Sequence, residues 1–250
     1  MPRRWGLVDS RPGQESIRWG ELSADEQLLD VLAGRLIGEP SREPIYLVCT
    51  HGRHDACCAV RGRPAAAALA AAYPDRTWEC SHVGGDRFAA NVVLLPHSLF
   101  YGHVPPSQVV DLVKRYDEGV IVPEYYRGSG AFPAPVQAAQ HFARAAGHSR
   151  GVTALHPVTV RQSAPTHWQI TLATPEANSL ATPEPNSLAA PENDSASGPD
   201  SITDPEQAGN HVLQVEVAAH TVSVDARMTC AARPPGHVRQ YTLESVLTRP

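Results

Sequence analysis

The sequence lacks the features of a membrane or exported protein. No apolar run approaches the length of about twenty residues that is needed to cross a bilayer. The opening residues, Met-Pro-Arg-Arg-Trp-Gly, are not followed by an apolar core of signal-peptide length. We therefore expect a cytoplasmic protein with no membrane partner. In that compartment its five cysteines are expected to be ligands or reactive thiols rather than disulfides.

The sequence also has no excess of basic residues that would form a face for nucleic acid. Its formal net charge is −5, and residues 173–209 contain seven acids but no Lys or Arg. The rest of the chain therefore carries a net charge of +2, which is close to neutral for its length. We expect no nucleic-acid partner.

Two familiar catalytic motifs are missing. The sequence contains no Gly-x-Ser-x-Gly, so acyl transfer has no support. Gly84-Gly85 lacks the lysine and the glycine spacing of a phosphate-binding loop. These motifs therefore give no indication of an enzyme.

Residues 173–209 differ in composition from the rest of the chain. Imperfect eight-residue repeats of the form Leu-Ala-x-Pro-Glu begin at Leu172, Leu180 and Leu188. Low hydrophobicity and charge of one sign leave too little apolar surface to offset the entropy of ordering. We predict that this segment is a disordered, acidic, proline-rich insertion at the tip of a hairpin.

Apolar patterns divide the chain into three regions. Residues 1–43 are expected to form a strand and a helix, which begins at the capping box Ser23-Ala-Asp-Glu26 and packs its leucines against the next domain. Residues 44–150 predict an α/β domain in the order strand, helix, strand, hairpin, helix, which is the order of a thioredoxin-like fold. Residues 151–250 are expected to form a small β-rich C-terminal domain that carries the insertion.

Sulfur and imidazole are concentrated between residues 49 and 91. This stretch holds four of the five cysteines and three of the twelve histidines. Cys49 ends a predicted strand, and Cys58 follows a loop at 50–61 that precedes a helix expected to start near Pro64. A loop of that length can aim both sulfurs at one point.

A second predicted strand carries Cys80 and His82. The two residues are two positions apart, so their side chains point to the same face, about 6.5 Å from one another. Cys49 with Cys58 is one pair, and Cys80 with His82 is the other. Each pair lies near the end of one of two neighbouring strands, so the two pairs can converge on a single centre. Thiolates together with imidazole suit an iron–sulfur cluster or zinc.

Three further residues have less specific signals. Asp86 lies four residues after His82, across Gly84-Gly85, where the backbone can turn tightly. We expect that Cys57 is not a ligand, since Cys58 keeps the spacing. Cys230 stands alone in a predicted strand, and we expect it to be a buried structural thiol.

These motifs resemble the two signatures of the sucrase/ferredoxin-like family. The first is Cys49-Thr-His-Gly-x-x-Asp-x-x-Cys58, and the second is His82-Val-Gly-Gly-Asp86-Arg-Phe-Ala-Ala-Asn91. The segment Leu-Pro-His-Ser-Leu-Phe-Tyr-Gly at 95–102 also fits. The resemblance covers residues 40–150, with a weaker match around Cys230.

The resemblance implies a thioredoxin-fold [2Fe–2S] protein. It implies that Cys49, Cys58 and His82 hold the cluster, together with a histidine at position 86. This chain departs from the pattern because Asp86 stands there, and a carboxylate is a poor ligand for soft cluster iron. The fourth ligand is therefore open between Cys80, our first choice, and Asp86.

We weigh three functions. The first is an electron carrier with one [2Fe–2S] cluster, whose partner is an unknown redox protein, either a reductase or an acceptor. The second is a binding module with a structural zinc ion at the same Cys and His residues. The third is a sugar hydrolase, which needs two facing carboxylates, and Asp55 with Asp86 is the only pair near the motifs. We expect an electron carrier and not a glycosidase.

Deleting residues 173–209 tests the prediction that this segment adds nothing to the folded core. Since such a composition buries little apolar surface, we expect the melting temperature of the deletion variant to stay nearly unchanged. Circular dichroism during heating measures this. Loss of the cooperative melting transition would contradict the prediction.

Overall fold

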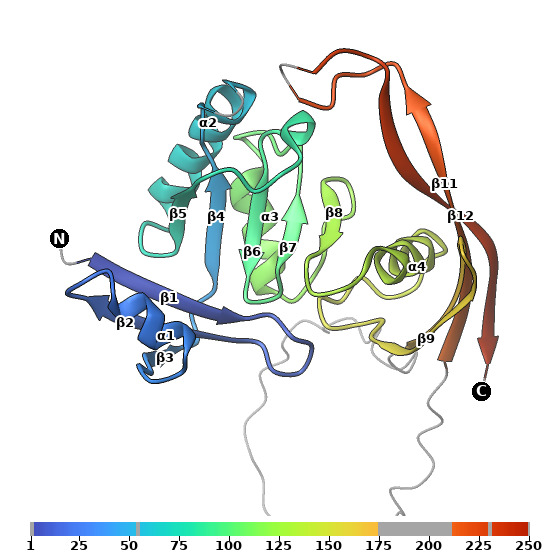
Figure 1. Ribbon diagram of the computed structural model, residues 1–250, viewed down its shortest axis with the longest axis horizontal. Helices are drawn as coiled ribbons and strands as arrows, with labels where there is room; N and C mark the ends of the chain where they lie inside the picture. The colour runs from blue at the N-terminus through green and yellow to red at the C-terminus, as the bar shows by residue number, and fades with distance from the viewer. Residues whose placement is uncertain (1–2, 54–55, 175–211, 230–231, 250) are drawn as a thin grey trace, which may run out of the picture.

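The computed structural model (Figure 1) describes residues 3–53, 56–174, 212–229 and 232–249. The strands in these ranges form three sheets. No helix in the described residues is long and apolar enough to span a lipid bilayer. Most of the predicted insertion at 173–209 lies outside the described residues, as do Asp55 and Cys230.

The first sheet is a small antiparallel one at the N-terminus, with the order β1-β2-β3. Its strands are β1 (Arg3–Asp9), β2 (Ser16–Leu22) and β3 (Glu39–Ser41). Trp5 and Ile17 are buried in it. The predicted N-terminal strand is therefore present, as one edge of a sheet.

The helix predicted in this region is much shorter than expected. It is α1 (Gln27–Leu32), and Ser23 Oγ donates a hydrogen bond to the Gln27 side chain instead of capping the backbone. The leucines are exposed, with Leu32 78% accessible, so they do not pack against the next domain. The prediction was wrong because Gly34, at a φ of 70°, ends the helix after six residues.

The central sheet has the order β5-β4-β6-β7-β8. Its strands are β4 (Ile45–Cys49), β5 (Thr77–Cys80), β6 (Val92–Leu95), β7 (Leu99–Tyr101) and β8 (Tyr126–Ser129). β4 and β5 are parallel, and the other neighbouring pairs are antiparallel. Helix α2 (Ala56–Ala72) connects the parallel pair, and α3 (Val109–Asp117) follows the β6–β7 hairpin. This order confirms the thioredoxin-like fold.

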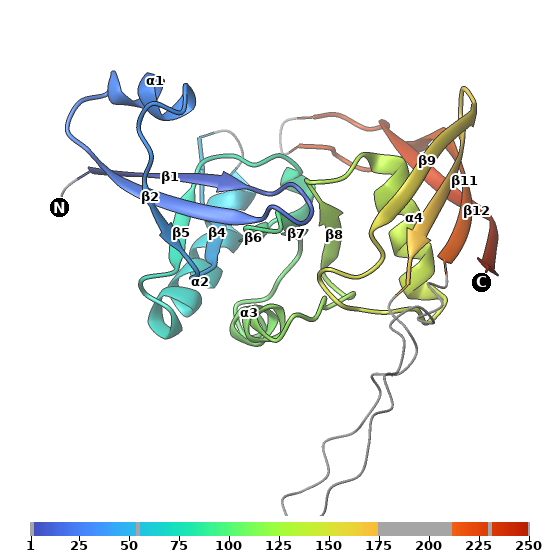
Figure 2. The same cartoon turned by 90° about the horizontal axis from the view of Figure 1, so that it is seen from below.

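The main core lies between the central sheet and its two helices. α2 and α3 cover one face of the sheet, while the β1–β2 hairpin crosses on the other side (Figure 2). Val92 and Leu94 of β6 are fully buried, as is Leu69 of α2. An unbroken apolar run such as 92–95 is typical of a strand covered on both faces, which is why the sequence identifies this strand well.

A third, antiparallel sheet forms the C-terminal part, with the order β12-β11-β10-β9. Its strands are β9 (Pro157–Ala164), β10 (His167–Ala173), β11 (Val212–Val224) and β12 (Gly236–Arg249). Helix α4 (Ala134–Ala145) buries Val136 and Ala139 against this sheet. The sequence pattern predicts separate strands at 211–218 and 221–230. Within the described residues there is instead one strand, β11, which pairs with β12 from Val212 to Val224, and residues 225–229 are not part of it.

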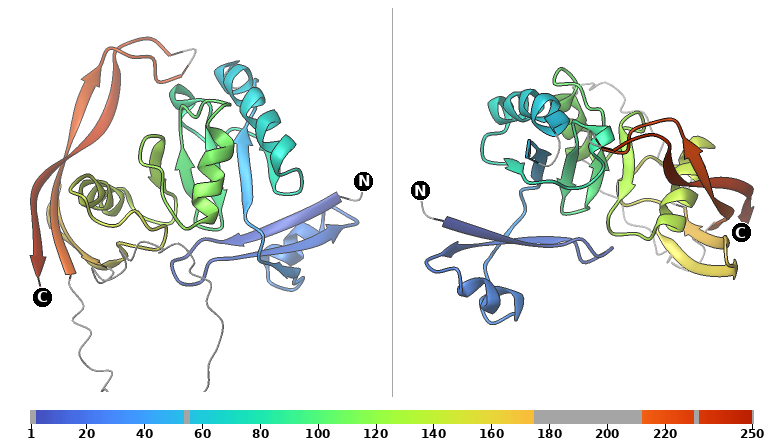
Figure 3. Two further views of the ribbon diagram at one scale, coloured as in Figure 1. Left: turned by 180° about the vertical axis from the view of Figure 1, so that it is seen from behind. Right: turned by 45° about the horizontal axis from the view of Figure 1, so that its top comes forward.

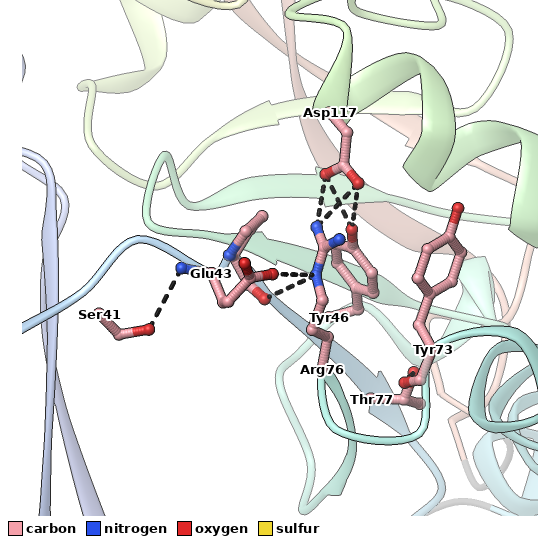
Figure 4. Close-up of polar contacts among 8 residues, drawn as sticks. Ser41, Glu43, Tyr46, Tyr73, Arg76, Thr77 and Asp117 are labelled. Atoms are coloured by element: carbon pink, nitrogen blue, oxygen red, sulfur yellow. Dashed lines mark hydrogen bonds and ion pairs between the residues drawn. The ribbon is translucent and has the colours of Figure 1, made fainter.

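Arg76 connects the central sheet to the end of α3. Its Nη2 atom donates hydrogen bonds to both carboxylate oxygens of Asp117, at 2.6 and 2.8 Å (Figure 4). The Tyr46 hydroxyl donates to the same carboxylate at 2.8 Å. The Arg76 guanidinium also lies 4.5 Å from the centre of the Tyr46 ring, and its side chain is only 18% exposed. This network joins residues that are far apart in the chain.

We expect Asp117→Asn to lower the free energy of unfolding by about 1.5–3 kcal/mol. The reason is that an amide cannot accept hydrogen bonds at both atoms, so charged and buried donors lose a partner. Urea denaturation measures the change.

Glu118→Gln is the matched control. Glu118 pairs with Arg115 at 3.3 Å, but both side chains are about half exposed, so we expect a loss of no more than about 0.5 kcal/mol. Equal losses in the two variants would show that the Asp117 network contributes no more than a surface ion pair.

Candidate metal centre

Cys49 and Cys80 lie at the ends of neighbouring strands. Cys49 is the last residue of β4 and Cys80 is the last residue of β5, and the two residues are partners in the parallel β4–β5 register. Cys49 is 1% exposed, whereas Cys80 is half-buried. The strand pairing therefore places both cysteines at one edge of the central sheet.

Cys58 lies in the first turn of α2 and not at the end of a loop. The sequence predicts a loop at 50–61 and a helix from about Pro64, but α2 begins at Ala56 and contains that proline. The prediction was wrong because Cys58 and Gly62 are buried against the end of β4, and this packing offsets the hydrogen bond that a proline removes.

Gly62 determines how closely α2 approaches β4. A Cβ atom at this position would lie 2.0 Å from the carbonyl oxygen of Cys49. Only glycine leaves room for such a contact. Because Gly62 lies one turn after Cys58, the contact fixes the start of the helix beside Cys49. The first turn of a helix also carries partial positive charge, which stabilises a nearby thiolate.

The segment after β5 turns His82 and Asp86 back toward the cysteines. Gly85 has a φ of 69° and leads into the short 3₁₀ helix η1 (Asp86–Phe88). Asp86 is 4% exposed, and its Oδ1 atom lies 3.0 Å from His82 Nδ1. The Cys58 thiol donates a hydrogen bond to the same oxygen at 3.5 Å. A buried carboxylate is thus in contact with both the imidazole and one thiol.

Three donor groups converge at this edge of the sheet. The sulfurs of Cys49 and Cys58 and a ring nitrogen of His82 all lie within 4.8 Å of one another. Ala89 is buried with the two cysteines, and we call these three residues the thiol cluster. The His82 side chain is 31% exposed. The group is therefore enclosed on the sulfur side and open to solvent on the imidazole side.

Cys80 and Asp86 are not members of this group of mutually close donors, although both border it. Cys80 packs against the thiol cluster, and Asp86 makes the contacts given above. Cys57 also packs against the thiol cluster, but its Sγ donates a hydrogen bond to the backbone oxygen of Asp86 at 3.2 Å and is not one of the three close donors. Of the predicted site residues, the structure thus brings three together and leaves two at the border.

The thiols of Cys58 and Cys80 have raised pKa values, so these two groups keep their protons when no cation is near. Burial, and then hydrogen bonding with Cys49, raise the pKa of the Cys58 thiol well above its ordinary value. Burial, and then the charge of Cys49, raise the pKa of Cys80 to about 11. A bound cation would reverse this preference, because metal ions bind the thiolate. Closely packed and buried thiols therefore fit a metal centre.

The role of Gly62 in the approach of α2 to β4 was not predicted, although the sequence carries a signal for it. A glycine inside a helix is less favourable than alanine by about 1 kcal/mol, and the residues around it in α2 are rich in alanine. An isolated glycine in such a setting usually has a packing reason. Here that reason is the contact with the Cys49 carbonyl.

Comparison with known families agrees with the motifs. The sequence model of the Sucrase/ferredoxin-like family matches residues 13–128, which confirms the resemblance. Two curated proteins called "Altered inheritance of mitochondria protein 32" are also similar. The one from Meyerozyma guilliermondii is 34% identical over 97 residues, which is 34% of each chain. The one from Candida glabrata is 29% identical over 96 residues, or 32% of this chain and 31% of that one. The matched segment spans about a third of these relatives.

The solved structures that are similar include a thioredoxin-like [2Fe–2S] ferredoxin from Aquifex aeolicus. One structure of it is 18% identical, with a TM-score of 0.33, and covers 38% of this chain and 98% of that chain. Another is 19% identical, with a TM-score of 0.31, and covers 36% and 100%. The thioredoxin-like fold follows from the strand order of the central sheet.

We expect Gly62→Ala to destabilise the protein and to reduce the amount of metal bound on purification. Helix propensity alone predicts the opposite, a gain of about 1 kcal/mol. The new Cβ, however, would overlap the Cys49 carbonyl oxygen and push α2 away from β4. Thermal melting and elemental analysis of the purified variant measure the two effects.

Ala67→Gly is the control within the same helix. Ala67 is exposed, so this change lowers helix propensity without touching β4. We expect a lower melting temperature with an unchanged metal content. A Gly62→Ala variant that melts at a higher temperature and keeps its metal would contradict the role of the close contact.

Proposed function

We propose that this chain, whose residues 13–128 match the Sucrase/ferredoxin-like family, is an electron carrier that holds one [2Fe–2S] centre. The observation that carries the proposal is the convergence of two buried thiols and one imidazole within 4.8 Å. Mixed thiolate and imidazole ligation is known for [2Fe–2S] centres. The expected partner is a redox protein, either a reductase or an acceptor.

The types of donor atom, two thiols and one imidazole, fit such a centre. When bound, a [2Fe–2S] centre takes up and releases one electron. Cys49 and Cys58 would supply thiolates from a wall that excludes water, since each residue is only 1% exposed. His82 would supply an imidazole, which carries less negative charge than a thiolate. The reduction potential should therefore lie above the value of about −400 mV of all-cysteine plant-type centres.

The fourth ligand separates two candidate functions. Cys80 would complete a set of three thiolates and one imidazole, and soft sulfur ligands favour an iron–sulfur centre. It is the β4–β5 partner of Cys49 and packs against the thiol cluster. On the chemistry of the donors, Cys80 remains our first choice for the electron carrier.

Asp86 supports the second candidate, a binding module with a structural zinc ion. Its buried carboxylate already contacts His82 and Cys58. Two cysteines, one histidine and one aspartate are ordinary zinc ligands. In a tetrahedral zinc site with bonds of about 2.0–2.3 Å, donor atoms lie about 3.3–3.8 Å apart. The close spacing of the three donors in this chain is compatible with that geometry.

Purification without oxygen, followed by assays of iron, acid-labile sulfide and zinc, distinguishes the two candidates. We expect about two irons and two sulfides per chain, with a visible absorption spectrum that bleaches on reduction. One zinc per chain with no visible absorption would replace the electron carrier by the zinc module.

Single cysteine variants then test the ligand assignment. We expect Cys49→Ala and Cys58→Ala to lose most of the bound metal. Cys57→Ala is the matched control, because its sulfur is directed to the backbone of Asp86, and it should keep the metal. Equal metal contents in all three variants would rule out the proposed site.

A further inference from the structure

A cavity of about 520 Å³ lies between β8, α4 and β12, on the C-terminal side of the central sheet. The long β11–β12 hairpin curves past α4 along this side of the molecule (Figure 3). The side chains at its wall that matter for binding are Tyr126, Arg127, Gln137, Phe142, Arg239 and Tyr241. A volume of this size is within the usual range for small-molecule sites.

Arginines from two elements give the cavity positive charge, which no described acidic side chain of its wall balances. Arg127 comes from β8 and Arg239 from β12, so two separate elements each supply a guanidinium. None of the described residues that line the cavity is Asp or Glu. No described carboxylate forms an ion pair with either arginine. Two guanidinium groups at the wall of one cavity, neither in an ion pair with a described carboxylate, favour an anion with several oxygens.

A third arginine, Arg87, does not line the cavity but contacts the same aromatic ring as Arg127. The guanidinium of Arg127 lies 3.0 Å from the centre of the Phe88 ring, and that of Arg87 lies 4.2 Å from the same centre. Desolvation, and then the charge of Arg87, lower the pKa of Arg127 to about 10. Like charges held this close repel one another, and an anion at Arg127 would offset that repulsion.

Aromatic side chains also line the cavity, beside small and polar residues. Phe142 comes from α4 and Tyr241 from β12, so rings from two elements line the space, while Gln137 adds an amide. Aromatic rings bury large apolar area and stack on flat groups with offset or edge contacts. The wall therefore combines an anion-binding part with a part that suits a planar ring.

We propose that this cavity binds a phosphorylated small molecule with a planar ring, of the nucleoside diphosphate class. Arg127 and Arg239 hold the phosphate oxygens, and the rings of Phe142 and Tyr241 pack against the base. The site is separate from the thiols of the candidate metal centre, so the proposal does not rest on the proposed electron transfer.

Isothermal titration calorimetry of the full chain with ADP, inorganic pyrophosphate and adenosine tests the two parts of the site, the arginines and the aromatic rings. We expect ADP to bind at least ten times more tightly than pyrophosphate, which lacks the ring, and than adenosine, which lacks the phosphates. Equal affinities for ADP and pyrophosphate would mean non-specific attraction of anions and would overturn the proposal. Absence of binding by ADP would overturn it as well.

Arg239→Gln is the main variant, because this side chain is exposed and its replacement should leave the fold intact. A lost charge-assisted hydrogen bond weakens binding about tenfold or more. Arg161→Gln on β9 is the matched control, since it removes the same charge from an exposed site outside the cavity. The proposal fails if both variants bind ADP equally well.

Arg127→Gln is a second test of the phosphate contact. Because Arg127 packs over Phe88, the folding of this variant is checked by circular dichroism before the titration. A folded variant should bind ADP at least ten times more weakly and should bind adenosine as the unmodified chain does. Unchanged affinity for ADP would exclude Arg127 from the site and overturn the proposal.

Discussion

The candidate centre depends on one close contact, that of α2 with the end of β4. Gly62 lets the helix come so near that any side chain at this position would overlap the Cys49 carbonyl oxygen. On its other side, the Cys49 amide donates a hydrogen bond to the carbonyl of Asn91 at 3.0 Å, which ties in the segment that follows η1. The helix, the strand and that segment are thus fixed around a single residue. The convergence of Cys58 and His82 on Cys49 follows from this arrangement.

Local patterns were enough to predict the strands around the site. The run at 92–95 is apolar throughout because it is a central strand. Cys49 and His82 each stand in a short motif that directly follows or ends a predicted strand. The start of α2 was not predictable in the same way. Pro64 is typical of a first helical turn, and only the packing of Cys58 and its neighbours against β4 extends the helix before it. Tertiary contact here overrides local preference.

Long-range polar contacts could not be predicted from the sequence. The hydrogen bond between Tyr46 and Asp117 joins residues that are 71 positions apart, and nothing in either local sequence indicates the other. Asp86 is an intermediate case. The sequence shows that it replaces the expected histidine, but its burial and its contact with His82 Nδ1 come only from the turn at Gly85. The chemistry of such a residue depends on its surroundings more than on its type.

The thiol cluster is small and separate from the two larger hydrophobic cores. It contains three buried residues, whereas the core beneath the central sheet extends over β4, β6, α2 and α3. So few apolar contacts give little local stability, and segments of this kind open without unfolding the whole domain. A metal ion that binds both thiols would therefore act as a local cross-link. Hydrogen exchange at the backbone amides of η1 would slow when the ion binds, while amides of β6 would keep the protection of the global fold.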